Sequence, residues 1–174
     1  MFIMNNPSNN IFLIGMMGSG KSYWGKIISE VIGYKFVDMD ELLIQEEGKT
    51  INEIFVDKGE IYFRNRETDI LKQSFNWKDN FVMATGGGLP CFNNNMKALN
   101  NHGITIWLNE PVDILCSRLL KEKDHRPLLK NLTDEGLMTF IENKLIEREP
   151  YYSQAKFTLT AKDLTETFIK QLIQ

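Results

Sequence analysis

Residues 15–22 read Gly-Met-Met-Gly-Ser-Gly-Lys-Ser, which fits the phosphate-binding pattern G-x-x-x-x-G-K-[ST]. An apolar run at 11–14 precedes this stretch, and a helix-compatible segment follows it. Glycines let consecutive backbone N–H groups turn inward around a phosphate, and a helix N-terminus adds positive potential. The pattern predicts that Lys21 reaches the β and γ phosphates of a nucleotide and that Ser22 ligates Mg²⁺. The alternative is an ordinary glycine turn, but the strand–loop–helix context favours a phosphate loop.

The composition is that of a soluble globular protein, with 174 residues of which 43% are hydrophobic and 25% charged. The net charge of −3 argues against nucleic-acid binding. Cys91 and Cys116 lie far apart, without metal-ligand spacing, which is typical of reduced thiols in a cytosol. No apolar run reaches the ~18 residues of a membrane span. We therefore expect a cytoplasmic protein of one domain, 1–174, with no nucleic-acid or membrane partner.

Five short β-like runs alternate with helical stretches, which predicts an α/β protein with a parallel sheet. The expected strands are 11–14, 34–37, 81–85, 103–108 and 157–160. The expected helices are 21–32, 40–47, 51–58, 60–75, 111–120, 134–147 and 164–173. The charged segment at about 121–134 has no apolar period and is interpreted either as a mobile lid over the nucleotide or as a surface loop.

Two strand ends carry residues suited to a ligand site. Asp38 and Asp40 close the second expected strand, and Gly86–Gly88 follow the third. In open parallel sheets, ligands lie at the carboxyl ends of the strands. One carboxylate can support Mg²⁺ through water while the other accepts a hydrogen bond from a substrate hydroxyl. The alternatives are that Asp40 caps the next helix and that the glycines form a tight turn.

Three arginines stand apart as candidate anion ligands, because the guanidinium fork binds carboxylates and phosphates with two hydrogen bonds. They are Arg64, Arg126 and Arg148. Glu67 lies three residues after Arg64, where an intrahelical ion pair is expected. Pro150 is expected to end the helix that carries Arg148. Each arginine, taken alone, is also consistent with an ordinary surface charge.

Taken in order, these motifs resemble the shikimate kinase family, which belongs to the nucleoside-monophosphate-kinase-like P-loop proteins. The resemblance runs from residue 11 to about residue 152, and the ordered set is far more specific than the phosphate loop alone. Its parts are residues 15–22, Asp38-Met39-Asp40, Gly59-Glu60 with Phe63-Arg64 and Glu67, Gly86-Gly87-Gly88, Arg126-Pro127-Leu128-Leu129, and Arg148 with Pro150 and Tyr152.

The resemblance implies ATP-dependent phosphorylation of the shikimate 3-hydroxyl, in the pathway to aromatic amino acids. It implies a monomer with a three-layer α/β/α sandwich of the P-loop kinase type and a mobile lid. The implied catalytic residues are Asp40, Lys21 and Arg126. The implied shikimate contacts are Asp40, Arg64, Gly86, Gly87, Gly88 and Arg148. The implied ATP contacts are Gly18, Ser19, Gly20, Lys21, Ser22, Tyr23 and Arg126. Ser22 would ligate Mg²⁺, and Asp38 would support it through a bound water.

The chain departs from the family pattern at two places. Tyr23 stands where the family usually has Thr, and 161–163 reads Ala-Lys-Asp where the family often has an arginine beside the adenine. Arg118 is a candidate adenine neighbour, with solvent exposure as the alternative. Two other functions are considered, a kinase for another small hydroxy acid such as gluconate and a nucleotide-binding regulatory module without catalysis. The arginines with the triple glycine argue against the first, and the retained Lys21, Ser22, Asp38, Asp40 and Arg126 argue against the second.

Overall fold

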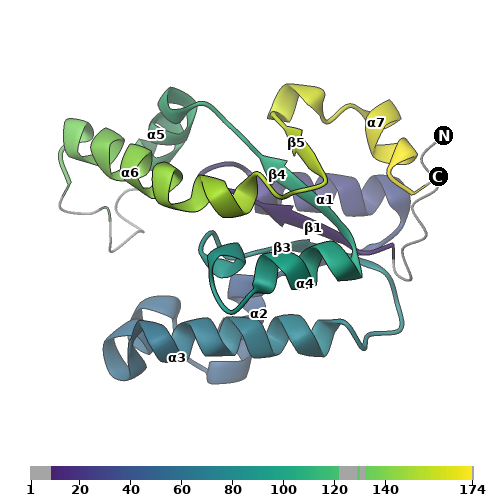
Figure 1. Ribbon diagram of the computed structural model, residues 1–174, viewed down its shortest axis with the longest axis horizontal. Coiled ribbons are helices and arrows are strands. Elements are labelled where there is room, and N and C mark those ends of the chain that lie inside the picture. The colour runs from purple at the N-terminus through teal and green to yellow at the C-terminus, as the bar shows by residue number, and fades with distance from the viewer. Residues whose placement is uncertain (1–8, 122–128, 130–131, 174) are drawn as a thin grey trace.

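Five parallel strands form one sheet in the order β2-β3-β1-β4-β5, as the computed structural model of residues 9–121, 129 and 132–173 shows (Figure 1). The strands are β1 (Ile11–Ile14), β2 (Lys35–Asp38), β3 (Phe81–Ala84), β4 (Ile104–Leu108) and β5 (Phe157–Leu159). Each bound lies within one residue of the expected one. The predicted five-stranded parallel sheet is therefore confirmed.

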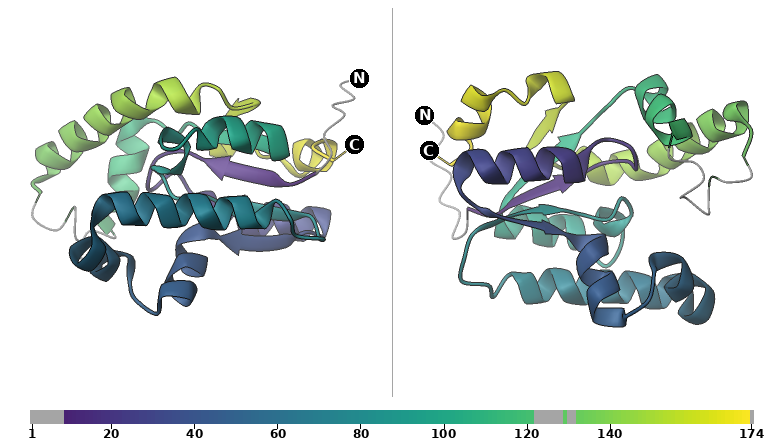
Figure 2. Two further views of the ribbon diagram at one scale, coloured as in Figure 1. Left: turned by 60° about the horizontal axis from the view of Figure 1, so that its bottom comes forward. Right: turned by 180° about the vertical axis from the view of Figure 1, so that it is seen from behind.

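Helices cover both faces of the sheet, because alternate residues of a strand point to opposite sides. On one face, Phe12 and Ile14 of β1 pack in one cluster with α3 (Ile51–Ser74) and α4 (Asn95–His102). On the other, β1 packs with α1 (Lys21–Ile32) and α7 (Glu166–Gln171), the two helices at the front in the right-hand view of Figure 2. The predicted three-layer sandwich is confirmed.

The second strand leads directly into the helices that carry Asp40 and Arg64, two of the expected acceptor residues. α2 (Met39–Glu47) begins at the end of β2 and ends at Gly48, and α3 follows. The two helices expected at 51–58 and 60–75 form the single element α3, which is bent at Gly59, where φ is 78° and ψ is 172°. A positive φ is easily adopted only by glycine, so the glycine at position 59 determines where α3 bends.

The predicted end of the sixth helix is wrong. α6 (Asp134–Tyr152) continues through Pro150, instead of stopping before it. The proline removes one backbone hydrogen bond near the end of the helix, but the last turn is held from outside. Tyr152 is fully buried, and its hydroxyl donates a hydrogen bond to the Gly87 carbonyl at 2.5 Å. This tertiary contact outweighs the local preference of proline.

Two further helical segments differ from the expectation. α5 (Val112–Lys121) begins one residue after Pro111, and it packs on α6. The helix expected at 164–173 is shorter in the structure, where α7 covers Glu166–Gln171 and a 3₁₀ turn at Ala161–Asp163 precedes it. α4 and the 3₁₀ turn Leu89–Cys91 were not predicted, since asparagine is a weak helix former and 92–101 contains five of them.

The expected lid at about 121–134 lies mostly outside the described residues, which include only 121, 129 and 132–134 of it. Among the helices that the structure describes, none has the length and apolar character needed to span a bilayer.

The start of α3 provides a test of the fold. The Thr50 hydroxyl accepts the Glu53 N–H, and the Glu53 carboxylate accepts the Thr50 N–H at 2.8 Å, which together form a capping box. We expect Thr50→Ala to lower the free energy of unfolding by about 1 kcal/mol. Urea unfolding measures this change. Thr139→Ala, the same substitution at an exposed site inside α6, is the control. An equal loss in both variants would contradict the assigned cap.

Candidate functional site

The phosphate loop connects β1 to α1 and has the backbone geometry that its glycines predict. Gly15, Gly18 and Gly20 have φ values of 140°, 78° and 89°. Gly20 precedes α1, and no side chain of the described residues caps this helix end, which is the arrangement of an anion site at a helix N-terminus. The Lys21 ammonium donates to the carbonyls of Gly15 and Met16, both at 2.9 Å. The loop therefore holds its lysine at the mouth of the helix.

A cavity of about 680 Å³ opens over this loop at the carboxyl ends of β1, β2 and β3. It brings together the phosphate loop, the two aspartates after β2 and the residues after β3, as the sequence predicts. Its lining residues are Met17, Gly18, Gly20, Lys21, Ser22, Tyr23, Trp24, Asp38, Asp40, Thr85, Gly87, Arg118 and Ala161. The loop residue Ser19 is buried and does not line the cavity.

Asp38 joins the phosphate loop to the second strand. Its Oδ2 accepts a hydrogen bond from the Ser22 hydroxyl at 2.6 Å, and its Oδ1 accepts the Asp40 N–H at 3.0 Å. Asp38, and not Asp40, is thus the N-cap of α2, so the alternative role considered for Asp40 is wrong. Asp38 supplies the cap, and the exposed Asp40 carboxylate lines the cavity.

Ser22 and Asp38 offer one hydroxyl and one carboxylate at a single point. This small oxygen set suits Mg²⁺, which usually keeps several waters and takes its other ligands from phosphate groups. A closed protein cage is not expected for such an ion, and the described part of the chain contains no group of three or more His, Cys, Asp or Glu side chains able to form one.

The triple glycine after β3 lies directly against the acidic and basic side chains of α3. A Cβ built on Gly88 would lie 2.6 Å from the Arg64 guanidinium carbon. One built on Gly86 would overlap Glu67 Oε1 and lie 3.4 Å from Asp40 Oδ1. These glycines are therefore required by the close approach of side chains, and Gly87 and Gly88 also lie in a turn. The expected contact of the glycines with a ligand stays a prediction.

Arg148 reaches the same backbone from α6. A Cβ on Gly87 would lie 3.2 Å from Arg148 Nη1, which also donates to the Met16 sulfur at 3.5 Å. Tyr152, one turn further along α6, is bonded to the Gly87 carbonyl. Its role was not foreseen from the sequence beyond the family pattern. Burial raises the pKa of the Tyr152 phenol to about 12, so the hydroxyl keeps its proton and remains a donor.

Arg64 is held at this point by two carboxylates, which confirms the predicted pair with Glu67. Its Nη1 contacts Glu67 Oε2 at 2.7 Å, and its Nη2 contacts Glu60 Oε1 at 3.1 Å. The guanidinium also lies 4.7 Å from the centre of the Phe92 ring. The Arg64 side chain is only 12% exposed, so its orientation is fixed by these contacts.

Glu67 is buried beneath Arg64 and has an unusual titration. Burial raises the pKa of its carboxyl to about 7, although attraction to Arg64 acts in the opposite direction. Its Oε1 has no hydrogen-bond partner among the described residues and faces Gly86. A carboxyl with this pKa changes its charge near neutral pH, beside the guanidinium that it orients.

At the far end of the cavity, the Glu110 carboxylate links Arg118 to the backbone of Ala161, a contact that the sequence did not indicate. Glu110, 6% exposed, accepts the Ala161 N–H at 2.5 Å and an Arg118 N–H at 3.1 Å. Arg118 also donates to the Gly18 carbonyl at 3.0 Å, so it is anchored and not a free surface charge. A carboxylate two residues after the apolar run of β4 was the available signal. Tyr23 is 65% exposed and packs edge-on against Trp24.

The expected site residue Arg126 lies outside the described residues. Every other expected site residue lies on the phosphate loop, at the start of α1, at the end of β2, after β3, on α3 or on α6. All of these segments meet around the carboxyl ends of the strands (Figure 1).

Known proteins resemble this chain over nearly its whole length. A family model described as shikimate kinase matches residues 17–174. A shikimate kinase from Flavobacterium psychrophilum is 41% identical over 154 residues, which cover 88% of this chain and 90% of the relative. The crystal structure of shikimate kinase from Bacteroides thetaiotaomicron has a TM-score of 0.85 at 37% identity and covers 95% of this chain and 94% of that one.

A second solved structure carries a ligand. It is the shikimate kinase from Acinetobacter baumannii in complex with shikimate, with a TM-score of 0.83 at 34% identity, and it covers 97% of this chain and 94% of that one. The sequence match, the shared fold and the phosphate loop facing a carboxylate- and arginine-lined strand end lead to one conclusion. The chain belongs to the shikimate kinase family.

Proposed function

We propose that this protein transfers the γ-phosphoryl group of ATP to the 3-hydroxyl of shikimate, giving shikimate 3-phosphate and ADP. The observation that carries the proposal is the contact of Gly86–Gly88 with Arg64, Glu67 and Arg148 beside the phosphate loop. Arg64 and Arg148 lie near the carboxylates of Glu67 and Asp40, and this set suits a small hydroxylated acid. The arginines bind the carboxylate of such an acid, and Asp40 accepts the proton of its hydroxyl group. The family to which the chain belongs has this activity.

For the acceptor, we assign the shikimate carboxylate to Arg64 and Arg148, and the ring to the backbone of Gly86–Gly88. The Asp40 carboxylate accepts the hydrogen bond of the 3-hydroxyl and aligns its oxygen with the γ-phosphorus. That oxygen forms the new P–O bond as the bond to the β–γ bridging oxygen breaks, and the hydroxyl proton passes to Asp40. Positioning and charge neutralisation contribute more to such a transfer than covalent chemistry does.

For the nucleotide, we assign the phosphates to the loop 18–22, with the Lys21 ammonium moving from the loop carbonyls to the β and γ phosphates. Ser22 and Asp38 would hold Mg²⁺, which when bound neutralises phosphate charge. Arg118, fixed by Glu110, and the exposed Tyr23 would border the adenine. We assign Arg126 to the transferring phosphate on the family pattern alone.

We further propose that the chain acts as a single monomeric domain, 1–174, in the cytoplasm, with a lid at about 121–134. The unpaired thiols of Cys91 and Cys116 support a reducing compartment. The net charge of −3 supports a small-molecule substrate in place of a nucleic acid.

The decisive experiment is a coupled assay of ADP release with shikimate, with gluconate and with no acceptor. We expect release to depend on shikimate, because the chain belongs to the shikimate kinase family and two arginines, Arg64 and Arg148, lie against Gly86–Gly88. Equal release without an acceptor would indicate an ATPase or a regulatory nucleotide-binding protein. Faster release with gluconate would assign the enzyme to another hydroxy acid.

The assignment of Arg148 predicts a selective defect in acceptor binding. Arg148→Ala removes a charge-assisted contact to the shikimate carboxylate, so we expect the KM for shikimate to rise on the order of tenfold to a hundredfold. The KM for ATP should stay near the wild-type value. Steady-state kinetics with each substrate varied in turn measure both constants.

Lys144→Ala is the control for this variant, because Lys144 lies one turn earlier on α6 and its ion pair among the described residues is with the exposed Glu147. It should leave both constants unchanged. An unchanged KM for shikimate together with a raised KM for ATP in Arg148→Ala would move Arg148 from the acceptor to the nucleotide.

The raised pKa of Glu67 predicts how stability depends on pH. Because its folded pKa of about 7 lies above its ordinary value of 4.5, the folded protein holds a proton that the unfolded chain has lost between these values. The contribution of Glu67 to stability is therefore present at low pH and is lost as pH rises through about 7. Urea unfolding of wild type and Glu67→Gln should show the wild type losing stability relative to the variant between about pH 5 and about pH 8.

Glu60→Gln, which alters the exposed carboxylate on the other side of Arg64, should retain the wild-type dependence on pH. Parallel pH profiles for wild type and Glu67→Gln would show that Glu67 is ionised throughout this range.

A further inference from the structure

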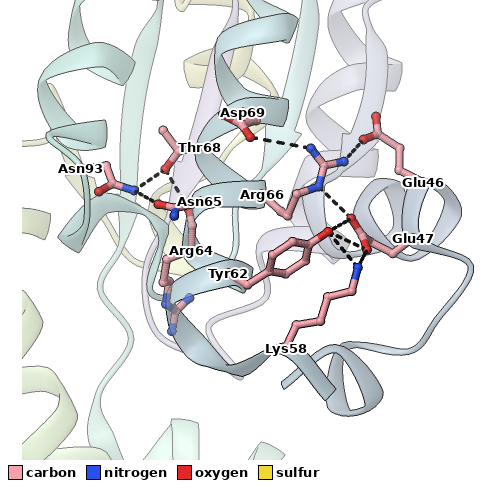
Figure 3. A network of polar contacts seen from close by, with 10 residues as sticks. All are labelled: Glu46, Glu47, Lys58, Tyr62, Arg64, Asn65, Arg66, Thr68, Asp69 and Asn93. Carbon is pink, nitrogen blue, oxygen red and sulfur yellow. Dashed lines mark hydrogen bonds and ion pairs between the residues drawn. The ribbon is translucent and has the colours of Figure 1, made fainter. Parts of the chain in front are cut away.

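A polar network outside the cavity joins the end of α2 to both halves of α3 (Figure 3). At its centre is Glu47, the last residue of α2. The Glu47 carboxylate accepts Arg66 Nε–H at 2.7 Å, the Tyr62 hydroxyl at 2.9 Å and the Lys58 ammonium at 3.1 Å. Arg66 also contacts Glu46 at 2.8 Å, so both terminal glutamates of α2 bind α3.

The donors to Glu47 lie on both sides of the bend in α3. Lys58 directly precedes Gly59, whereas Tyr62 and Arg66 follow it, one turn apart on one helix face. The backbone at Gly59 leaves the helical region, so regular helix geometry does not set the angle of the bend. Glu47 constrains this angle from α2, because its single carboxylate holds the segments before and after the bend to the end of α2.

The same stretch of α3 presents its site residues in another direction. Arg64 lies two residues from Arg66, and positions two apart do not share a helix face. Figure 3 shows the two side chains leaving α3 in different directions, with Arg66 toward Glu47 and Arg64 away from it. A rotation of this segment about its axis would therefore move Arg64 relative to Gly88, against which it packs.

The network differs from the ion pairs that cover most protein surfaces. The Glu47 side chain is only 8% exposed and has three different donors. These donors, Arg66 first, hold the pKa of Glu47 at about 2, so it stays ionised near neutral pH. By contrast, the nearby pair of Lys49 and Asp57 at 2.6 Å joins two side chains that are each nearly half exposed. Exposed pairs of that kind contribute little.

We infer that Glu47 is a positioning residue for the acceptor half of the site: it fixes the α3 segment that carries Arg64 relative to α2, whose first turn carries Asp40. The inference rests on the proposed function, in which Arg64 binds the shikimate carboxylate and Asp40 its hydroxyl. Asp40 and Glu47 lie about 10 Å apart along α2, since each helical residue adds about 1.5 Å. The network thus sets the distance between the two groups that hold opposite ends of one small molecule.

The test is Glu47→Gln, which keeps the shape of the side chain and removes its charge. We expect the KM for shikimate to rise about tenfold and kcat to fall, because small displacements of positioning groups are strongly felt in transfer reactions. The KM for ATP should remain unchanged, since the phosphate loop has no part in the network. Lys49→Gln, which breaks the exposed pair at the same junction, should change neither constant.

Tyr62→Phe is the second variant, because it removes a single hydroxyl and leaves the ring in place, so it tests the network even if Glu47→Gln does not fold. It should raise the KM for shikimate in the same direction, by a smaller factor. Wild-type ADP release that does not depend on shikimate would remove the proposed function itself. The positioning role alone would be overturned if the wild type released ADP in a shikimate-dependent manner and the folded variants kept the wild-type kcat and KM for shikimate. It would also be overturned if the KM values for shikimate and for ATP rose equally in the variants.

Discussion

The absence of a side chain at Gly86–Gly88 is the constraint on which the rest of the site depends. A Cβ at these positions would meet Glu67, Arg148 and the Arg64 guanidinium in turn. Three side chains from two helices can therefore converge on one strand end, next to the loop that is built to hold phosphate. Gly88 shows the effect most clearly, because the planar guanidinium of Arg64 occupies the space that an alanine methyl group would need.

Charge in this protein is placed locally and is not spread over the surface. The chain is acidic, with a net charge of −3, yet its candidate substrates are anions. Two arginines, Arg64 and Arg148, and the lysine of the phosphate loop supply the positive charge where it is needed. Buried carboxylates hold the guanidiniums of Arg64 and Arg118 in fixed orientations. Glu67 does this for Arg64, and Glu110 does it for Arg118. This arrangement favours small anions over extended polyanions, whose binding requires a broad basic surface.

Local patterns in the sequence predicted the sheet, the phosphate loop and the meeting of Lys21, Ser22, Asp38 and Asp40 at one cavity, because strand runs and glycine spacing depend on neighbours in the chain. The errors arose where distant residues decide. Pro150 remains inside α6 because Tyr152 is bonded to Gly87, 65 residues away. Asp38 caps α2, although Asp40 was an equally good candidate by residue type. The contact of Glu47 with Arg66 spans 19 residues, and that of Glu110 with Ala161 spans 51, so no local pattern identifies the partner of either carboxylate.

The central claim is that the strand end at Gly86–Gly88 places a small hydroxylated carboxylate in front of the phosphate loop. A crystal structure of the protein with shikimate and a non-hydrolysable ATP analogue tests it most directly. The account predicts the shikimate carboxylate on Arg64 and Arg148, its 3-hydroxyl on Asp40, and the γ-phosphate at Lys21 on the same side of the ring. Shikimate bound away from these arginines, or with its carboxylate toward the phosphate loop, would contradict the account.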